Sequence, residues 1–406
     1  MSIWQDKTIE ERIAIVQNTA LRTNIEDLAI EKDWWVTITL KALFSTSFSE
    51  FLLFKGGTSL SKGKWENIDL RRFSEDIDIS LSRSWFTETE EKQKLYPFAK
   101  CENNNQLKSL RKASREVIFE RLSPELNEQL AKLGAKDFYV ENVKSIMQDG
   151  VEIPIDTDRD PVVLNVVYPS ILDETNEYIQ PKVKIEISCM SMDEPFENRA
   201  LTSLIYDTFN EVDNATQCFV PTVLPIRTFL EKALLLNEEY QKKSPRSERM
   251  SRHLYDLERL MDTYSETAIN DSELYKSIIE HRKKFYHISS VDYDSDKREN
   301  IKIWPTGEME KFCAMLGFSK EMTESLIVKK EALKCSGKIY SEQHRRNFDI
   351  KDDILRVEND PDDESRLNLT INRKPIADWF REQWHRLRYG ARVPQQEERK
   401  SRGFKL

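Results

Sequence analysis

The hydrophobic residues in the first part of the chain recur every three or four positions. Ile9, Ile13 and Val16 follow this spacing, and further apolar residues continue it to Leu43. Such a period is typical of helices that bury one face. We therefore expect residues 1–45 to form a helical segment that packs on a core farther along the chain.

The pattern then changes to a short apolar run, residues 51–54, which ends at Lys55 and the pair Gly56-Gly57. An apolar run of this length that is bounded by glycine is typical of a buried strand. Thr58 suits the N-cap of a following helix, because its hydroxyl can accept a hydrogen bond from a backbone N–H. The stretch predicts a strand, a glycine turn and a helix in succession.

Residues 77–81 alternate between apolar and polar positions, which is the period of a β-strand. Successive side chains of a strand point to opposite faces. Asp76 and Asp78 should therefore lie on one face, with Ile77 and Ile79 on the other.

Further strands and helices follow from the same periodicities. Two more strands are predicted at 162–168 and 183–188, and Glu186 falls on the polar face of the second. The helices are predicted at 105–133 with a break near Pro124, 225–240, 251–264, 272–286 and 319–334. Strands followed by helices indicate an α+β fold, with a core at 46–222 and a mainly helical C-terminal domain at 223–406.

Composition is that of a folded protein of about two or three domains. The 406 residues are 39% hydrophobic, 33% charged and 10% aromatic. The net charge of -9 argues against nucleic-acid binding over the whole surface and leaves room for a local basic patch. Residues 371–406 offer one, with ten Lys and Arg against four acids. The alternative for this tail is an amphipathic helix that packs through Trp379, Trp384 and Leu387.

The five cysteines are scattered and form no C-x-x-C pair. This usage favours reduced thiols in a cytoplasmic protein over a zinc site or a disulfide framework. The first residues lack the pattern of a signal peptide, and no apolar run approaches the length of a membrane span. We expect a cytoplasmic protein with no membrane partner.

Asp76 and Asp78 suit a metal site, because carboxylates at i and i+2 of a strand lie roughly 6 to 7 Å apart on one face. Oxygen ligands without His or Cys select Mg²⁺ or Mn²⁺, and Mg²⁺ usually takes further ligands from substrate phosphates. Alone, such a pair is more often two polar positions on an exposed strand. Gly56-Gly57, ahead of a predicted helix, adds a backbone that phosphate can approach closely. The combined pattern favours nucleotidyl transfer.

Five motifs in order resemble the AbiEii/AbiGii-type nucleotidyltransferase toxins of bacterial toxin–antitoxin and phage-defence systems. They are Ile30-Glu-Lys-Asp-Trp-Trp-Val36, Lys55-Gly-Gly-Thr-Ser-Leu60, Arg72-Phe-Ser-Glu-Asp-Ile-Asp-Ile79, Leu230-Glu-Lys-Ala233 and Arg252-His-Leu-Tyr-Asp-Leu257. The resemblance implies a polymerase-β-like nucleotidyltransferase core. In the last motif His253 stands where the family usually has an acid.

The resemblance implies a role for each matching residue. Asp76 and Asp78 would bind the metal, Lys232 would contact the nucleotide phosphates, and Asp256 would complete the site from the helical half. Glu186 would be a third carboxylate, or else an exposed strand acid beside Lys184. The residues implied to hold the triphosphate or to lie at the active site are Lys55, Gly56, Gly57, Thr58, Ser59 and Ser74.

The resemblance also implies the substrates and partners. The enzyme would use an NTP with Mg²⁺ or Mn²⁺, transfer the nucleotide to RNA at the 3′ end of tRNA, and so block translation. A cognate antitoxin would restrain it. Two alternatives remain open at this point: an NTP-dependent phosphotransferase that uses the same metal site, and a catalytically inactive member that binds a partner.

Overall fold

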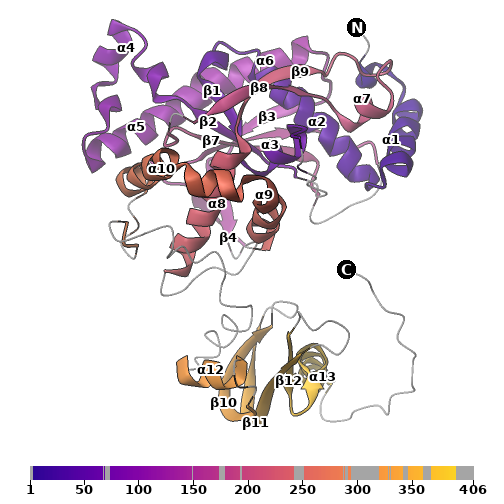
Figure 1. The fold of residues 1–406 in the computed structure, drawn as a ribbon. Helices are drawn as coiled ribbons and strands as arrows, with labels where there is room; N and C mark the ends of the chain where they lie inside the picture. The colour runs from indigo at the N-terminus through magenta and orange to yellow at the C-terminus, as the bar shows by residue number, and fades with distance from the viewer. Residues whose placement is uncertain are drawn as a thin grey trace. The chain divides into compact units, whose positions relative to one another are not determined.

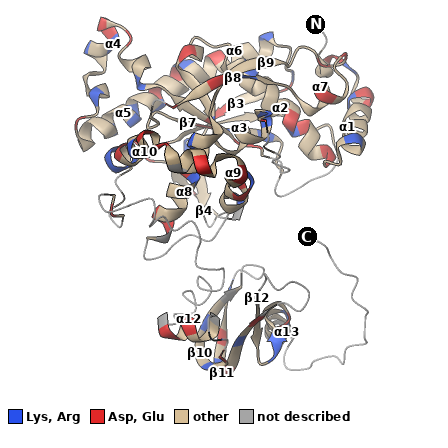
Figure 2. Ribbon diagram, viewed as in Figure 1, with Lys and Arg blue, Asp and Glu red and all other residues tan. Residues whose placement is uncertain are grey.

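The computed structural model describes residues 3–389, except 67, 69–73, 149, 173–178, 193, 242–250, 287, 289–290, 294–319, 328, 330, 342–345 and 360–366. The chain divides into two compact units, Met1–Ile303 and Trp304–Leu406 (Figure 1). Both signs of charge occur together on the outer helices of the first unit (Figure 2).

The first unit is built on a seven-stranded mixed sheet with the strand order β3-β6-β7-β2-β1-β9-β8. The pairs β2–β7 and β1–β9 are parallel, and the other pairs are antiparallel. The strands are β1 Leu52–Lys55, β2 Ile77–Leu81, β3 Tyr139–Asn142, β6 Val162–Val167, β7 Lys182–Ser188, β8 Phe196–Leu201 and β9 Cys218–Val223. A separate hairpin joins β4 Ser145–Gln148 to β5 Val151–Pro154.

One face of this sheet is apolar and carries the main core. Ile77, Ile79, Ile185 and Ile187 alternate along the two central strands and are completely buried there. The same core includes apolar residues of α1, α2, α5 and α6. These helices are α1 Ile9–Thr23, α2 Asp27–Leu43, α5 Asn104–Val117 and α6 Ser123–Lys132, and a π-helical turn at Ile118–Leu122 joins the last two. The predicted α+β core, a mixed sheet with flanking helices, is confirmed.

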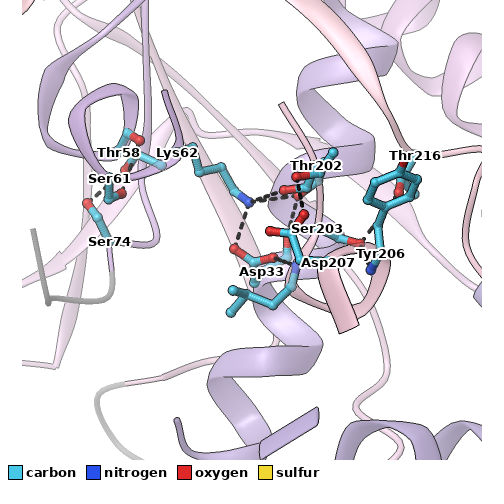
Figure 3. A network of polar contacts seen from close by, with 12 residues as sticks. Asp33, Thr58, Ser61, Lys62, Ser74, Thr202, Ser203, Tyr206, Asp207 and Thr216 are labelled. Atoms are coloured by element: carbon cyan, nitrogen blue, oxygen red, sulfur yellow. Dashed lines mark hydrogen bonds and ion pairs between the residues drawn. The ribbon is translucent and has the colours of Figure 1, made fainter. Parts of the chain in front are cut away.

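Helix α2 is fastened to α3 and to the segment after β6 by charged residues of the Glu-Lys-Asp-Trp-Trp motif. Glu31 accepts hydrogen bonds from the Ser170 hydroxyl at 2.6 Å and the Ile171 backbone N–H at 3.0 Å. Asp33 forms a buried ion pair of 2.6 Å with Lys62 of α3 Gly56–Lys62, which Figure 3 shows beside α7 Leu204–Thr208. These residues of the motif therefore hold α2, α3 and the segment after β6 together.

Three further helices of the first unit pack on a second core. They are α8 Pro225–Tyr240, α9 Ser251–Asn270 and α10 Ser272–Phe285. Leu230 and Leu234 of α8 meet Leu257 and Leu260 of α9 in that core, and Ile278 of α10 adds to it. A short helix, α4 Glu90–Leu95, completes the α-helices described in this unit.

The second unit differs from the predicted mainly helical C-terminal domain. It contains an antiparallel sheet of β10 Leu333–Ser341, β11 Arg346–Asn359, β12 Leu367–Ile371 and β13 Lys374–Pro375, with α12 Lys320–Ile327 and α13 Ile376–Tyr389. The helix predicted over 319–334 is thus too long, because the chain is already extended at Leu333. A register shift beside Gly337 and a positive φ at Asp352 interrupt the alternation that would have signalled strands.

The aromatic residues of the C-terminal tail pack inside this second unit. Trp379 is buried in its core, and Phe380 and Trp384 pack against it. The amphipathic-helix alternative therefore describes α13, although Leu387 is 57% exposed and takes no part in the packing. The rest of the basic tail, from residue 390, lies outside the described residues.

Candidate active site

Three charged residues from neighbouring strands form one row across the polar face of the sheet. Lys55 at the end of β1 is the direct partner of Asp78 on β2, and Asp78 is the direct partner of Glu186 on β7. Directly opposed residues point to the same face, and neighbouring strands lie about 4.8 Å apart. Residues separated in sequence by up to 131 positions, from Lys55 to Glu186, are thereby brought side by side.

This row forms part of the wall of a cavity of about 280 Å³ between the sheet and helices α8 and α9. Nine of the residues predicted for the site line it, namely Lys55, Gly56, Gly57, Thr58, Ser74, Asp76, Asp78, Glu186 and Lys232. Ser59 is completely buried, and its hydroxyl donates to the carbonyl oxygen of Gly56 at 2.9 Å. The side chain of Ser59 thus stabilises the Gly56-Gly57 turn and does not line the cavity.

Gly56 lies against Asp78 so closely that no side chain fits between them. Its φ is +83°, and a Cβ atom built there would lie 1.9 Å from Oδ2 of Asp78. Only glycine combines that backbone conformation with that approach. Gly57 lies in the first turn of α3.

Thr58 has a role that differs from the predicted N-cap. Helix α3 begins at Gly56, so Lys55 occupies the N-cap position and Thr58 lies inside the helix. The Thr58 hydroxyl donates to the carbonyl oxygen of Asp76 and lies 2.8 Å from Oγ of Ser74 (Figure 3). Thr58 therefore fastens the glycine turn to the segment that carries Ser74 and Asp76.

The two aspartates lie in an environment that disfavours their charge. Burial raises the pKa of Asp78 to about 7, Glu186 adds to the shift, and Lys55 opposes it. Burial also raises the pKa of Asp76, and the nearby Lys184 ammonium partly offsets this. Adjacent carboxylates that are hard to ionise together are stabilised by a cation placed between them.

Opposite the row, Lys232 projects from α8 and is held by residues of α9. Its ammonium nitrogen lies 3.0 Å from Oδ2 of Asp256 and 3.4 Å from Nδ1 of His253. Asp256 is completely buried, so it acts on the cavity through Lys232. His253, which replaces the usual acid of the family motif, lines the cavity itself.

The most important site residue that sequence reasoning missed is Glu231. Thr228, Glu231, Lys232 and Leu235 share one face of α8 at helical spacing and line the cavity together. That spacing was a signal for the face. Arg227 lies only four positions before Glu231, but its other partner, Arg282, lies 51 positions away in sequence.

The Glu231 carboxylate is anchored by two arginines beneath the cavity. One oxygen lies 2.9 Å from Nη1 of Arg227, and the other lies 3.5 Å from Nη1 of Arg282. Burial opposes its ionisation, but Arg227 and the surrounding cations hold its pKa well below the usual range. Burial likewise disfavours the charged form of Lys55 and is the largest single influence on it, but Glu231, Tyr286, Glu194 and Asp78 together outweigh burial, and the pKa of Lys55 is raised. Glu231 is therefore a fixed anion at the cavity that helps to keep Lys55 charged.

The donor set fits a divalent cation that also takes ligands from its substrate. Asp76 and Asp78 line the cavity and supply hard oxygen ligands. Glu186 is paired with Lys184. Over the part of the chain that the structure describes, no group of three His, Cys, Asp or Glu side chains converges as a preformed metal centre. Two carboxylates plus water and phosphate suit Mg²⁺ or Mn²⁺.

Comparison with known protein families decides the identity of this fold and cavity. The profile of the family described as nucleotidyl transferase AbiEii toxin, type IV toxin–antitoxin system, matches residues 39–328. The chain belongs to this family. The matched range contains every cavity residue named above, so the AbiEii profile and the cavity describe the same part of the molecule.

Among solved structures, the AbiEii protein described here is similar to MenT4, a nucleotidyltransferase toxin from Mycobacterium tuberculosis H37Rv. The sequence identity is 17% and the TM-score 0.40, over 76% of this chain and 86% of that chain. No curated protein matches the sequence. The resemblance predicted from the five motifs is confirmed, and this AbiEii protein is a nucleotidyltransferase toxin of a type IV toxin–antitoxin system.

Arg72, within the third motif, lies outside the described residues. Within the described residues no helix is both long enough and apolar enough to cross a membrane.

Proposed function

We propose that this AbiEii toxin transfers a nucleoside monophosphate from an NTP to a hydroxyl of an RNA acceptor, at the 3′ end of tRNA, and so blocks translation. The observation that carries the proposal is the row Lys55–Asp78–Glu186, which faces Lys232 across one cavity. It combines anionic residues suited to a metal with cationic residues suited to phosphates.

In the proposed reaction, the acceptor oxygen forms a bond to the α-phosphorus and the bond from that phosphorus to the bridging oxygen breaks. Pyrophosphate leaves, and the hydroxyl proton passes to the Glu186 carboxylate and then to solvent. A divalent cation held by Asp76 and Asp78 would stabilise negative charge on the attacking and leaving oxygens. No covalent intermediate with the protein is needed.

The other residues bind and orient the triphosphate. Lys55 and Lys232 are cations on two walls of the cavity and can neutralise the β and γ phosphates. Asp256 holds Lys232 in place at 3.0 Å, and Glu231 supports the charge of Lys55. Gly56 and Gly57 let phosphate oxygens approach the backbone closely. Ser74 is hydrogen-bonded to Thr58, the residue that follows the two glycines, and lines the same cavity.

The proposal also covers the acceptor and the biological setting, which go beyond membership of the family. Free thiols at Cys101, Cys189, Cys218 and Cys335 fit a cytoplasmic toxin that meets tRNA there. A cognate antitoxin would restrain the enzyme, and release of the toxin during phage infection would stop translation. The experiment is to incubate purified protein and Mg²⁺ with total RNA and each α-labelled NTP. Label on tRNA in at least one lane supports the proposal, and no transfer in any lane, with Mg²⁺ or Mn²⁺, contradicts it.

One alternative reaction uses the same cavity. In a phosphotransferase, the γ-phosphoryl group rather than the nucleotide would pass to a hydroxyl acceptor. The row that contains Asp78 does not by itself distinguish the two, so the position of the label must decide. A catalytically inactive partner-binding protein is the other alternative. It predicts that Asp76→Ala and Asp78→Ala leave growth inhibition intact.

A further inference from the structure

The face of the sheet that carries the active-site row continues beyond it across two more strands. Glu186 of β7 is opposed by Val163 of β6, and Lys182 of β7 is opposed by Val167 of β6. Val167 in turn is opposed by Tyr139 of β3, the edge strand. All five side chains therefore point to the same face as Asp78.

A second row lies on this face between the active site and Tyr139. Lys184 of β7 is opposed by Asn165 of β6, which is opposed by Glu141 of β3. The Asn165 side-chain amide donates to the Glu141 carboxylate at 2.8 Å, which confirms that both point to this side. Lys184 lines the cavity, and its ammonium partly offsets the effect of burial, which raises the pKa of Asp76.

This half of the polar face is accessible over the described part of the chain. Tyr139 is 58% exposed, and Val163 and Val167 are only partly buried. On the opposite face of the same strand, Leu164 and Val166 are completely buried. Val163, Val167 and Tyr139 therefore give this part of the polar face an accessible apolar strip, although Asn165 between the two valines is buried.

The surface is continuous with the cavity on the side from which an acceptor can arrive. Val223 and helix α8 close the cavity on the β9 side, whereas Lys184 and Glu186 of β7 form its other side. Beyond β7 lies the accessible face, and Tyr139 on β3 is three strands from β2, roughly 14 Å across the sheet. The accessible face therefore borders the cavity at Lys184 and Glu186.

We propose that the face formed by Tyr139, Val163, Val167, Lys182 and Lys184 binds the single-stranded end of the RNA acceptor. Tyr139 stacks on an unpaired base, the valines form an apolar floor, and Lys182 and Lys184 contact phosphates. The assignment rests on the proposed nucleotidyl transfer to RNA, and adds where the acceptor lies and which residues hold it.

The test measures the KM for total tRNA and the KM for the NTP separately in the full-length protein. Tyr139→Ala should raise the KM for tRNA about fivefold or more, the effect of losing one base stack, and leave the KM for the NTP unchanged. Tyr139→Phe retains the ring and should behave like the wild type. Phe219→Ala is the matched control and should have no effect. Phe219 is 70% exposed on β9, which lies near the opposite edge of the sheet from β3.

A second measurement uses a short 5′-labelled single-stranded RNA and binding at several salt concentrations. Lys182→Gln should lower the slope of log affinity against log salt by about 0.7, the loss of one phosphate contact on a single strand. If Tyr139→Ala and Lys182→Gln both leave RNA affinity and KM unchanged while the wild type transfers nucleotide to tRNA, the face is not the acceptor site. If the wild type transfers nucleotide to no RNA, the proposed function itself fails.

Discussion

Gly56 and Asp78 are packed so closely that a single methyl group cannot enter between them. The Cβ atom of an alanine at position 56 would lie 1.9 Å from Oδ2 of Asp78, at a backbone φ of +83°. The turn that approaches the proposed triphosphate and the carboxylate that would bind the metal are thus in direct contact. The shape of the site depends on both residues at once.

We predict that Gly56→Ala lowers nucleotide transfer at least about 100-fold, because Asp78 must move by about an ångström or more. Gly150→Ala is the matched control. Gly150 has a similar φ of +80° but no heavy atom within 4 Å of the added Cβ, so it reports backbone strain alone. That strain should destabilise the fold by about 1 kcal/mol without affecting transfer. Equal losses of activity in the two variants would contradict the close-contact explanation.

We predict that Asp256→Asn weakens NTP binding roughly 10- to 100-fold, because Lys232 loses the charged partner that lies 3.0 Å away. The measurement is the dissociation constant of a non-hydrolysable NTP analogue by calorimetry. Asp262→Asn, on the same helix, serves as control because its side chain is exposed. Unchanged NTP affinity in Asp256→Asn would show that Asp256 does not act through Lys232.

The buried pair of Asp33 and Lys62 should dominate the attachment of α2 to α3. Lys62 also donates to the Thr37 hydroxyl at 2.8 Å, and the Leu204 backbone N–H donates to Asp33 at 2.8 Å, so both ends of the pair are hydrogen-bonded. Lys62→Met leaves the Asp33 charge buried and should lower the free energy of unfolding by about 3 to 5 kcal/mol. The double variant Lys62→Met with Asp33→Leu should recover much of this loss. Urea titration measures both, and a Lys62→Met protein as stable as the wild type would contradict the assignment.

His281 should make the fold sensitive to acid. Burial, together with Arg227 and other nearby cations, lowers its pKa from 6.5 to about 4. Because the folded pKa lies below the unfolded value, the stabilisation is fully present above pH 6.5 and is lost as the pH falls towards 4. A shift of this size corresponds to at most about 3 kcal/mol. His281 stacks on Phe285 with ring centroids 4.5 Å apart.

His281→Phe keeps this ring contact and removes the titrating group. The wild type should lose more unfolding free energy than His281→Phe between pH 7 and pH 4.5. Parallel pH profiles of the two proteins would mean that His281 does not contribute.

Periodicity in the sequence was sufficient to predict the strands and the polar faces that carry Asp76, Asp78 and Glu186. It could not predict that Lys55, Asp78 and Glu186 form one row, because alternation along a strand gives the face and not the neighbouring strand. The roles of Thr58 and Glu231 were missed for a similar reason. Thr58 contacts Ser74 and Asp76, which lie 16 and 18 positions away. Glu231 pairs with Arg227, four positions away, and also with Arg282, 51 positions away. The distant contacts leave no local pattern.

The strands of the second unit were missed for a different reason. β11 carries Phe348 and Ile350 inward, then passes Asp352 with φ of +53° before Leu355 and Val357 turn inward again. This interruption divides the alternation of apolar and polar residues into pieces that are too short to be identified as strands. Helix α13 next to it has a clear period, and its packing through Trp379 was among the predictions.

The central claim is that the cavity around Asp78 transfers a nucleotide to RNA. The most direct measurement is to incubate the protein with tRNA, Mg²⁺ and the active NTP, labelled in parallel at the α or the γ phosphate, and to compare wild type with Asp76→Ala and Asp78→Ala. We predict that α-label appears on the tRNA and γ-label leaves as pyrophosphate, and that either substitution abolishes transfer. Transfer of γ-label to the tRNA, or undiminished α-label transfer by both variants, would contradict the account.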